Sequence, residues 1–250
     1  MATHAVPLDK EGARIRGMFA GVAPRYDLLN HLLSGSLDRV WRRRLAVSLG
    51  LPAGARVLDL CSGTGDQAVA LERIGLRVAA ADFCLPMLAL AAPKFARSRG
   101  PRPRPLQADA LSLPFPGAGF DGATVSFGLR NVADLGRALS ELARVLRPGG
   151  ELGVLEFTVP ARQPLRALYL FYFRRLLPGI GGLISGDRQA YSYLPESVLG
   201  FPQREAFVAR LAAAGFESGR FESLSGGILA LYRARKRGPS AAGPLPENPR

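Results

Sequence analysis

The segment with the clearest chemical meaning is VLDLCSGTGD, at residues 57–66. An apolar strand runs into Gly63-Thr64-Gly65, and a helix is expected to follow at once. Glycine lets the backbone turn sharply and lets a ligand approach where a Cβ atom would collide. The turn lacks the third glycine of a dinucleotide fingerprint, and Asp59 stands four residues before Gly63. The pattern D-x-x-x-G-x-G therefore favours a cofactor that has an amino-acid tail and no pyrophosphate.

Three further polar positions follow the ends of later strands. Asp82 ends the run RVAAAD about 20 residues after the turn, where a carboxylate can accept hydrogen bonds from both ribose hydroxyls. An aspartate in this place also commonly caps a helix, and that alternative stays open. Asp109-Ala110 follows the next strand and suits an adenine amino group, and Ser126 ends the run ATVS. The carboxyl ends of parallel strands meet in one crevice, where open α/β sheets bind ligands.

Together these positions predict an S-adenosylmethionine site. The predicted cofactor contacts are Asp59, Gly63, Thr64, Gly65, Asp82, Asp109, Ala110 and Ser126.

The elements that must position these residues alternate along the chain. Short apolar runs occur at 56–60, 77–82, 104–109, 119–127 and 151–157, and amphipathic stretches at 66–74, 86–96, 134–146 and 203–213. This alternation is typical of βαβ units around a parallel sheet. Residues 216–224 and 226–236 are expected to form an antiparallel hairpin at the sheet edge. We therefore predict an α/β fold, a Rossmann-like class I methyltransferase with a mostly parallel seven-stranded sheet.

Three regions flank or interrupt the alternation. Residues 1–50 are expected to form an N-terminal helical lid, because apolar side chains recur there at helical spacing. Residues 51–236 would form the cofactor-binding domain, with an aromatic-rich helical insertion at about 161–198, before the last helix, as a substrate cover. The tail 237–250 is rich in proline, glycine and small polar residues, and we expect it to be disordered.

Composition narrows the class of protein. The 250 residues carry a formal net charge of +13, and only three of the 33 basic residues are lysines. Such a charge suits nucleic acid or a lipid surface, although a GC-rich genome also produces an arginine skew. The two cysteines, Cys61 and Cys84, show neither CxxC spacing nor a histidine cluster, so we predict no metal site and treat Cys61 as a packing residue. The N-terminal residues carry charges where a signal peptide needs an apolar run, so a cytoplasmic location is expected.

Longer stretches resemble the quinone-biosynthesis C-methyltransferases that act on demethylmenaquinol and on the ubiquinol precursor. The resemblance covers roughly residues 18–236 and is carried by MFAGVAPRYDLLNHLLSGSLDRVWRR, DALSLPFPGAGFDGATVSFGLRNVAD, RVLRPGGELGVLEF and SGDRQAYSYLPESVLGFP. Some positions depart from the family pattern. Asp38 stands three residues before Trp41, where the family usually has histidine, and Arg147 replaces the lysine of V-L-K-P-G-G.

The resemblance implies methyl transfer to a ring carbon of a prenylated quinol, with demethylmenaquinol as the favoured acceptor. A ubiquinol precursor or another small lipid-like molecule stays open as an alternative. The ring carbon is nucleophilic only when the neighbouring hydroxyl loses its proton. The resemblance therefore implies Arg130 as phenolate stabiliser or water-orienting group, Asn131 as its polar partner and Tyr191 as a further catalytic candidate. Further candidates for lining the ring pocket are Tyr26, Asp27, Asp66, Asp187 and Tyr193.

The isoprenoid tail of such a substrate lies in a bilayer, so we expect the chain to act at the membrane surface. The run Leu168–Phe173, followed by Arg174 and Arg175, suits contact with anionic lipid. The same aromatic side chains suit packing on the sheet or a homodimer interface, and these uses stay open.

Two rival classes differ in their sequence requirements. Methyltransferases of base amino groups usually carry an N/D-P-P-aromatic segment after the fourth strand, where this chain has Ser126-Phe127-Gly128-Leu129. We therefore expect no nucleic-acid partner. A cofactor-binding protein without catalytic activity is the other rival, and it would bind the cofactor without methylating any quinol.

Overall fold

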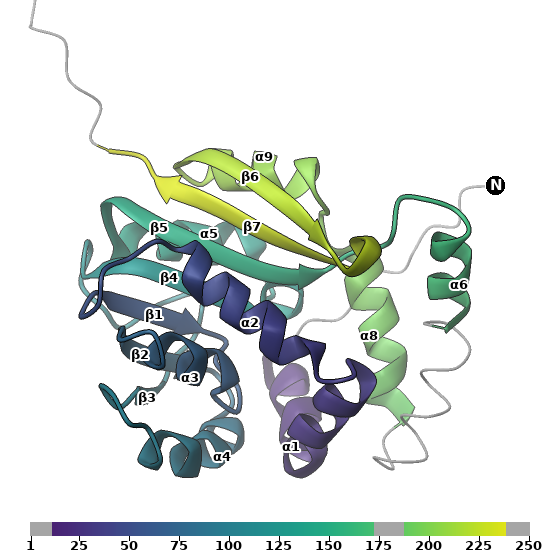
Figure 1. Cartoon of the computed structure of the whole chain (residues 1–250), viewed down its shortest axis with the longest axis horizontal. Coiled ribbons are helices and arrows are strands. Elements are labelled where there is room, and N and C mark those ends of the chain that lie inside the picture. Colours follow the sequence, from purple (N-terminus) through teal and green to yellow (C-terminus); the bar gives the residue numbers. More distant parts are fainter. Residues whose placement is uncertain (1–11, 173–187, 239–250) are drawn as a thin grey trace, which may run out of the picture.

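The structure is a computed structural model that describes residues 12–172 and 188–238, so the predictions for Asp187 and for most of the tail lie outside the described residues. A seven-stranded sheet forms its centre (Figure 1). The strands are β1 (Arg56–Leu60), β2 (Arg77–Asp82), β3 (Arg104–Gln107), β4 (Phe120–Ser126), β5 (Leu146–Phe157), β6 (Phe216–Leu224) and β7 (Leu229–Lys236). Their order is β3-β2-β1-β4-β5-β7-β6, and β7 runs antiparallel to both of its neighbours. The predicted α/β fold, with a mostly parallel sheet and an edge hairpin, is confirmed.

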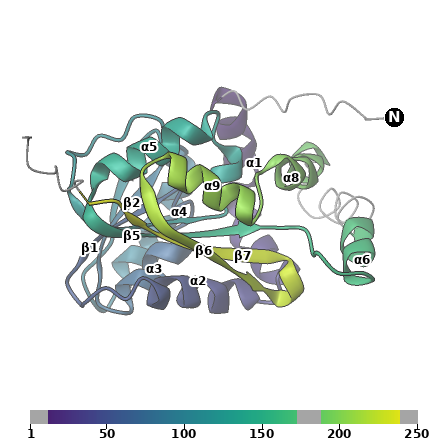
Figure 2. The same cartoon turned by 90° about the horizontal axis from the view of Figure 1, so that it is seen from above.

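Helices cover both faces of the sheet. They are α1 (Gly12–Leu33), α2 (Leu37–Ser48), α3 (Asp66–Glu72), α4 (Leu85–Ala96), α5 (Leu135–Val145), α6 (Leu165–Phe171), α8 (Arg188–Gly200) and α9 (Glu205–Ala213), with short 3-10 turns η1 (Leu129–Asn131) and η3 (Ser225–Gly227). Buried side chains of α2, α3 and α4 pack with Val57 and Val78, and those of α5 and α9 pack with Leu58 and Val125. Figure 2 shows α2 and α3 on the opposite side of the sheet from α5 and α9. Successive strand residues point to opposite faces, so two covered faces require strands that are apolar along their whole length.

Two elements differ from their predicted bounds. Strand β5 begins at Leu146 rather than at Glu151, because Leu146 pairs with Phe120 and a register shift then absorbs the intervening residues before Gly122 pairs with Glu151. The insertion contains two described helices, α6 and α8, rather than one. Among the described residues, no helix combines the length and apolar character that a membrane span requires.

Candidate active site

A pocket lies at the carboxyl ends of β1, β2 and β4, next to α1. Its position follows from the topology, because β1 and β4 are adjacent parallel strands whose chains leave the sheet at the same edge. The predicted site residues in its lining are Gly63, Asp82, Asp109, Ala110, Ser126 and Asn131, together with Tyr26 from α1. The structure thus gathers most of the strand-end residues around one space.

Asp82 is tied to the glycine turn. The backbone N–H of Gly63 donates to its Oδ2 atom at 2.7 Å, and the N–H of Cys84 donates to its Oδ1 atom at 2.8 Å. Burial raises the pKa of Asp82, and these backbone hydrogen bonds oppose the rise. A carboxylate offers about four acceptor sites, so Asp82 keeps acceptor capacity on its pocket side. Helix capping is not its role here, because Cys84 occupies the cap position of α4.

Asp59, Thr64 and Gly65 are not among the residues that line this pocket, and their direct contact with the cofactor stays a prediction. Asp59 is fully buried and accepts hydrogen bonds from Ser62 at 2.6 Å and Thr124 at 2.8 Å. Burial raises the pKa of Asp59 to about 6, although both hydroxyls lower it. These side chains support the turn from the core side, and Asp59 points toward Ser62 and Thr124.

Gly65 shows why this turn needs glycine. Its φ is +83°, and a Cβ atom there would lie 2.5 Å from the ring of Phe95 on α4. Any side chain would therefore strain the backbone and push α4 away from the turn. This packing fixes the distance between α3, which starts at the turn, and α4.

Two residues of the lining hold a left-handed backbone that is uncommon outside glycine, Cys61 with φ +56° and Phe127 with φ +62°. Such conformations cluster at functional sites. Cys61 packs closely against the turn at Gly128. A Cβ atom added at Gly128 would lie 2.3 Å from the Cβ of Cys61. Burial, followed by the charges of Asp82 and Asp59, raises the pKa of the Cys61 thiol. Cys61 is thus a packing residue that also lines the pocket as a neutral thiol.

Arg130 and Asn131 lie on η1, directly after the pocket-lining end of β4. Arg130 is buried behind the lining, and its Nη1 atom lies 2.7 Å from Glu156 and also donates to the carbonyl of Phe127. Asn131 lines the pocket, and its Nδ2 atom donates to the same carbonyl at 3.4 Å. Arg130 Nε and Asn131 Oδ1 are buried and have no hydrogen-bond partner among the described residues. Glu156 therefore neutralises part of the positive charge of Arg130. The sequence alone did not indicate Glu156 as a partner of Arg130.

The insertion brings tyrosines next to this ion pair. Helix α8 packs against η1, and Tyr193 on α8 has a buried hydroxyl without a hydrogen-bond partner among the described residues. Tyr169 on α6 is buried, and burial raises the pKa of both phenols while the charge of Arg130 lowers it. The charges of Arg130 and Glu156 thus both act on the phenols of Tyr169 and Tyr193. Tyr191 is part of α8, but its side chain lies outside the described residues.

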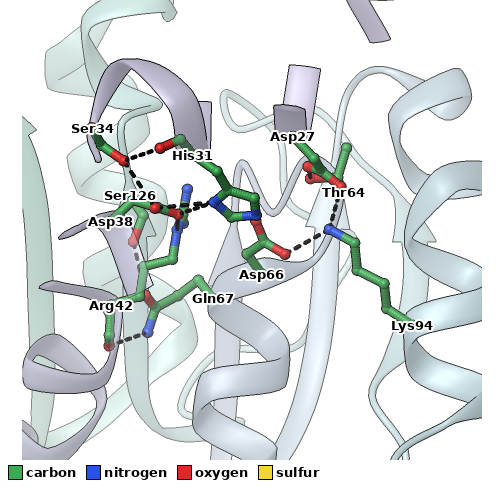
Figure 3. A network of polar contacts seen from close by, with 10 residues as sticks. All are labelled: Asp27, His31, Ser34, Asp38, Arg42, Thr64, Asp66, Gln67, Lys94 and Ser126. Carbon is green, nitrogen blue, oxygen red and sulfur yellow. Dashed lines mark hydrogen bonds and ion pairs between the residues drawn. The ribbon is translucent and has the colours of Figure 1, made fainter. Parts of the chain in front are cut away.

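A polar network holds α1 over the glycine turn (Figure 3). The Lys94 ammonium of α4 lies 2.6 Å from Asp27 on α1 and 2.6 Å from Asp66 on α3. Asp27 also accepts a hydrogen bond from the Thr64 hydroxyl at 2.5 Å. Asp27 and Asp66 are not among the residues that line this pocket, and their contacts fasten α1, the helix that does line it.

Asp38, the departure from the family pattern, is part of the same network. It is buried at the start of α2 and accepts hydrogen bonds from His31 and Ser34, each at 3.0 Å. His31, Asp38 and Asp66 offer ligand atoms within 4.8 Å of one another. Lys94 already pairs with Asp66, and Arg42 lies 3.9 Å from Asp38, so cationic side chains compensate both carboxylates. The aspartate at this position connects α1 to α2.

The sequence reasoning also missed most of the contribution of α1 to the pocket. Gly12, Ile15, Arg16 and Phe19 line it together with Tyr26. The first four positions follow the i, i+3, i+4, i+7 spacing of one helix face, and this spacing could have indicated that they lie on the same side of the helix. The predicted lid thus supplies one wall of the site.

The fold and the crevice at its strand ends define a class I S-adenosylmethionine-dependent methyltransferase. A methyltransferase of Thermotoga maritima, described as a possible histamine N-methyltransferase, matches with a TM-score of 0.64 and 20% identity over 88% of this chain and 99% of its own. Phosphoethanolamine N-methyltransferase 2 of Haemonchus contortus, solved with S-adenosylmethionine, matches with a TM-score of 0.58 and 17% identity over 79% of this chain and 52% of its own. The chain belongs to the ubiE/COQ5 methyltransferase family, whose sequence model matches residues 8–236.

Relatives in this family are similar over nearly their whole length. Demethylmenaquinone methyltransferase of Thermus thermophilus is 55% identical over 218 residues, which are 86% of this chain and 98% of the relative. The enzyme of the same name in Deinococcus radiodurans is 44% identical over 91% of this chain and 94% of its own. The ubiquinone/menaquinone biosynthesis C-methyltransferase UbiE of Geobacter sulfurreducens is 42% identical over 92% and 91%. The resemblance identified from the sequence is confirmed.

Proposed function

We propose that this methyltransferase methylates a ring carbon of a prenylated quinol, with demethylmenaquinol as the acceptor, in menaquinone biosynthesis. The relative at 55% identity carries the name demethylmenaquinone methyltransferase, which supports this acceptor. The structural observation that carries the proposal is the pair of buried atoms Asn131 Oδ1 and Arg130 Nε, which have no hydrogen-bond partner among the described residues. Buried polar atoms are ordinarily hydrogen-bonded, so this acceptor on the pocket lining and this donor on the residue directly behind it suit the oxygen of a bound ring.

The pocket residues fit S-adenosylmethionine, which supplies an electrophilic methyl group when it is bound. Asp82 would accept hydrogen bonds from the ribose hydroxyls, because its carboxylate keeps acceptor capacity in the pocket. Asp109 accepts the N–H of Leu111 on Oδ1, and its other oxygen suits the adenine amino group, with Ala110 beside it. Gly63 and Ser126 would line the space for the amino-acid tail.

The chain's own contribution to the chemistry concerns the quinol proton. Asn131 Oδ1 would accept a hydrogen bond from the reacting hydroxyl, which raises the electron density of the ring. Arg130 Nε would donate to the same oxygen and stabilise the negative charge that grows there, while the hydroxyl proton passes to solvent water, because an amide oxygen cannot hold it. Glu156 holds Nη1 of Arg130 and so fixes the direction of Nε. This assignment modifies the predicted role of Arg130, which now acts through one oriented donor rather than through a free positive charge.

Variants of Asn131 test this assignment. We expect Asn131→Leu to lower kcat about 100-fold, the loss typical for one positioned group, while the Kd for cofactor stays within about threefold. Asn131→Asp keeps an acceptor and should retain more activity. Arg130→Met should also lower kcat, and Arg210→Met, on the exposed surface of α9, is its matched control. An Asn131→Leu enzyme with unchanged kcat would overturn the assignment.

We further propose that the enzyme is cytoplasmic and acts at the inner face of the cell membrane, because the prenyl tail of the acceptor lies in that membrane. On α6, Leu168 and Phe171 are 65% and 56% exposed, while Tyr169 between them is buried. Arg166 is exposed on the same helix. An apolar edge next to a cationic side chain suits an anionic membrane surface and supports the lipid use of the insertion over a homodimer interface. We propose no nucleic-acid partner.

A further inference from the structure

Helix α2 has an apolar stripe on its outer side that the sheet does not cover. Leu37, Val40 and Val47 are 47%, 61% and 58% exposed. Their spacing of three and seven residues places them along one side of the helix, over a length of about 15 Å at 1.5 Å per residue. Trp41 and Leu45 are buried on the opposite side. We name the three exposed side chains the α2 stripe.

Exposed arginines flank the α2 stripe. Arg39 and Arg43 follow it at helical spacing on one side, and neither forms an ion pair with any described residue. Arg44 lies on the other side, where it pairs with Glu222 of β6. The acidic residue of this helix, Asp38, is buried on the inner side. The outer side of α2 is therefore both apolar and positively charged, with its two unpaired charges along one border.

This combination selects one kind of occupant. A second copy of the chain, docked through the same face, would bring Arg39 and Arg43 of both copies toward each other, and Glu222, the acidic side chain beside this face, already pairs with Arg44. A surface of anionic lipid offers negative charge for the arginines and an acyl boundary for the leucine and valines. We infer that the α2 stripe and its two arginines dock on an anionic bilayer surface.

Docking through α2 would also orient the enzyme. Figure 2 shows α2 along the outer side of the molecule, away from α5 and α9. Figure 1 shows that its first turn lies next to α1, the helix that lines the cofactor pocket. When α2 binds the lipid surface, the adjacent helix α1 lies close to the bilayer that contains the prenylated acceptor. In this respect the inference rests on the proposed function and adds a second contact to that of α6.

Vesicle binding tests the inference on the full chain. Vesicles of phosphatidylglycerol and phosphatidylcholine, and vesicles of phosphatidylcholine alone, are floated with the protein on a density gradient. We expect binding to the anionic vesicles that falls as salt rises. Arg39→Gln/Arg43→Gln should lower the partition coefficient about 30-fold, since each arginine near the surface contributes about 1 kcal/mol. Val40→Ser/Val47→Ser should lower it about tenfold, because two apolar side chains leave the acyl boundary.

Matched variants elsewhere on the surface serve as controls. Arg97→Gln/Arg99→Gln removes two exposed charges near the end of α4, and Leu90→Ser/Leu106→Ser removes two partly exposed leucines at 38% and 39%. Both controls should bind vesicles as the wild type does. Binding that falls equally in control and test variants would mean that overall charge, not α2, decides the affinity, and would overturn the inference. The inference would also be overturned if the wild type sediments as a dimer and Val40→Ser/Val47→Ser sediments as a monomer.

A second readout separates this inference from the proposed function. Methyl transfer to a quinol with a short, water-soluble side chain should be unchanged in the α2 variants, whereas transfer to a long-chain quinol in anionic vesicles should fall with their binding. A wild-type chain that methylates the soluble quinol but does not bind vesicles overturns the docking inference and leaves the proposed function standing. A chain that binds vesicles through α2 but methylates neither quinol leaves docking standing and overturns the proposed function.

Discussion

The ammonium of Lys94 on α4 lies 2.6 Å from the carboxylate of Asp27 on α1. The same ammonium reaches Asp66, so one positive charge joins the lid to the start of α3. Without it, two carboxylates would face each other and α1 would be less firmly held beside the pocket. We expect Lys94→Met to raise the Kd for S-adenosylhomocysteine about fivefold, since the pair is partly exposed to solvent. Titration calorimetry measures this Kd, and Lys94→Arg, which keeps the charge, is the control. Equal Kd values for Lys94→Met and the wild type would contradict this role of the network.

Gly65 and Gly54 form a matched pair for the glycine turn. Both have φ +83°, but a Cβ at Gly65 meets Phe95 at 2.5 Å whereas one at Gly54 meets nothing within 4 Å. We expect Gly54→Ala to lower the free energy of unfolding by about 1 kcal/mol through backbone strain alone. Gly65→Ala should cost about 3 kcal/mol, because crowding is added to the same strain. Urea unfolding of both variants checks the difference, and similar losses would show that the contact with Phe95 is not limiting.

Asp59 is fully buried and Asp82 is half-buried, and of these two carboxylates near the turn only Asp82 lines the pocket. We expect Asp82→Asn to raise the Kd for cofactor about 100-fold, the loss of two hydrogen bonds from ligand hydroxyls to a charged acceptor. Asp59→Asn should raise it less than about tenfold, because its contacts are Ser62 and Thr124. Titration of both variants with S-adenosylhomocysteine decides this. A larger loss from Asp59→Asn would contradict this expectation and support the predicted direct contact of Asp59 with the cofactor.

The pKa of Asp59 also predicts how stability changes with pH. Burial raises this pKa from 3.8 to about 6, so between these values the folded chain binds a proton that the unfolded chain has released. The contribution of Asp59 to stability is therefore complete below about pH 3.8 and is lost as pH rises through about 6. We expect the free energy of unfolding of Asp59→Asn, relative to wild type, to rise by about 2 kcal/mol from pH 4 to pH 7. A difference that stays flat over this range, measured by chemical unfolding, would show that Asp59 does not titrate in this way.

The elements that the sequence predicts best are those with a clear period. Strands β1 and β2 match their predicted bounds because apolar runs between glycines and charged residues allow few other structures. The start of β5 could not be predicted in the same way. Its first residues include Pro148 and Gly149, which indicate a turn, and only the pairing of Leu146 with Phe120 reveals the bulged strand.

The site was predictable where strand ends alone determine it, as for Asp82 and Ser126. It was not predictable where tertiary partners decide. The alternation of β1 turns Asp59 toward Thr124, which is 65 residues away in sequence. Glu156 of β5 pairs with Arg130 on η1, which follows the neighbouring parallel strand β4, and no local sequence pattern predicts such a partner.

The most direct test of the central claim is methyl transfer from labelled S-adenosylmethionine to demethylmenaquinol. The purified chain is given the chemically reduced naphthoquinol, the oxidised naphthoquinone and a reduced ubiquinol precursor in parallel, with Arg130→Met as a further sample. We predict that label enters the reduced naphthoquinol with the highest kcat/KM, that the oxidised quinone accepts none, and that the variant loses rate while it still binds cofactor. Label in none of the three acceptors, with cofactor binding intact, would contradict the proposed function.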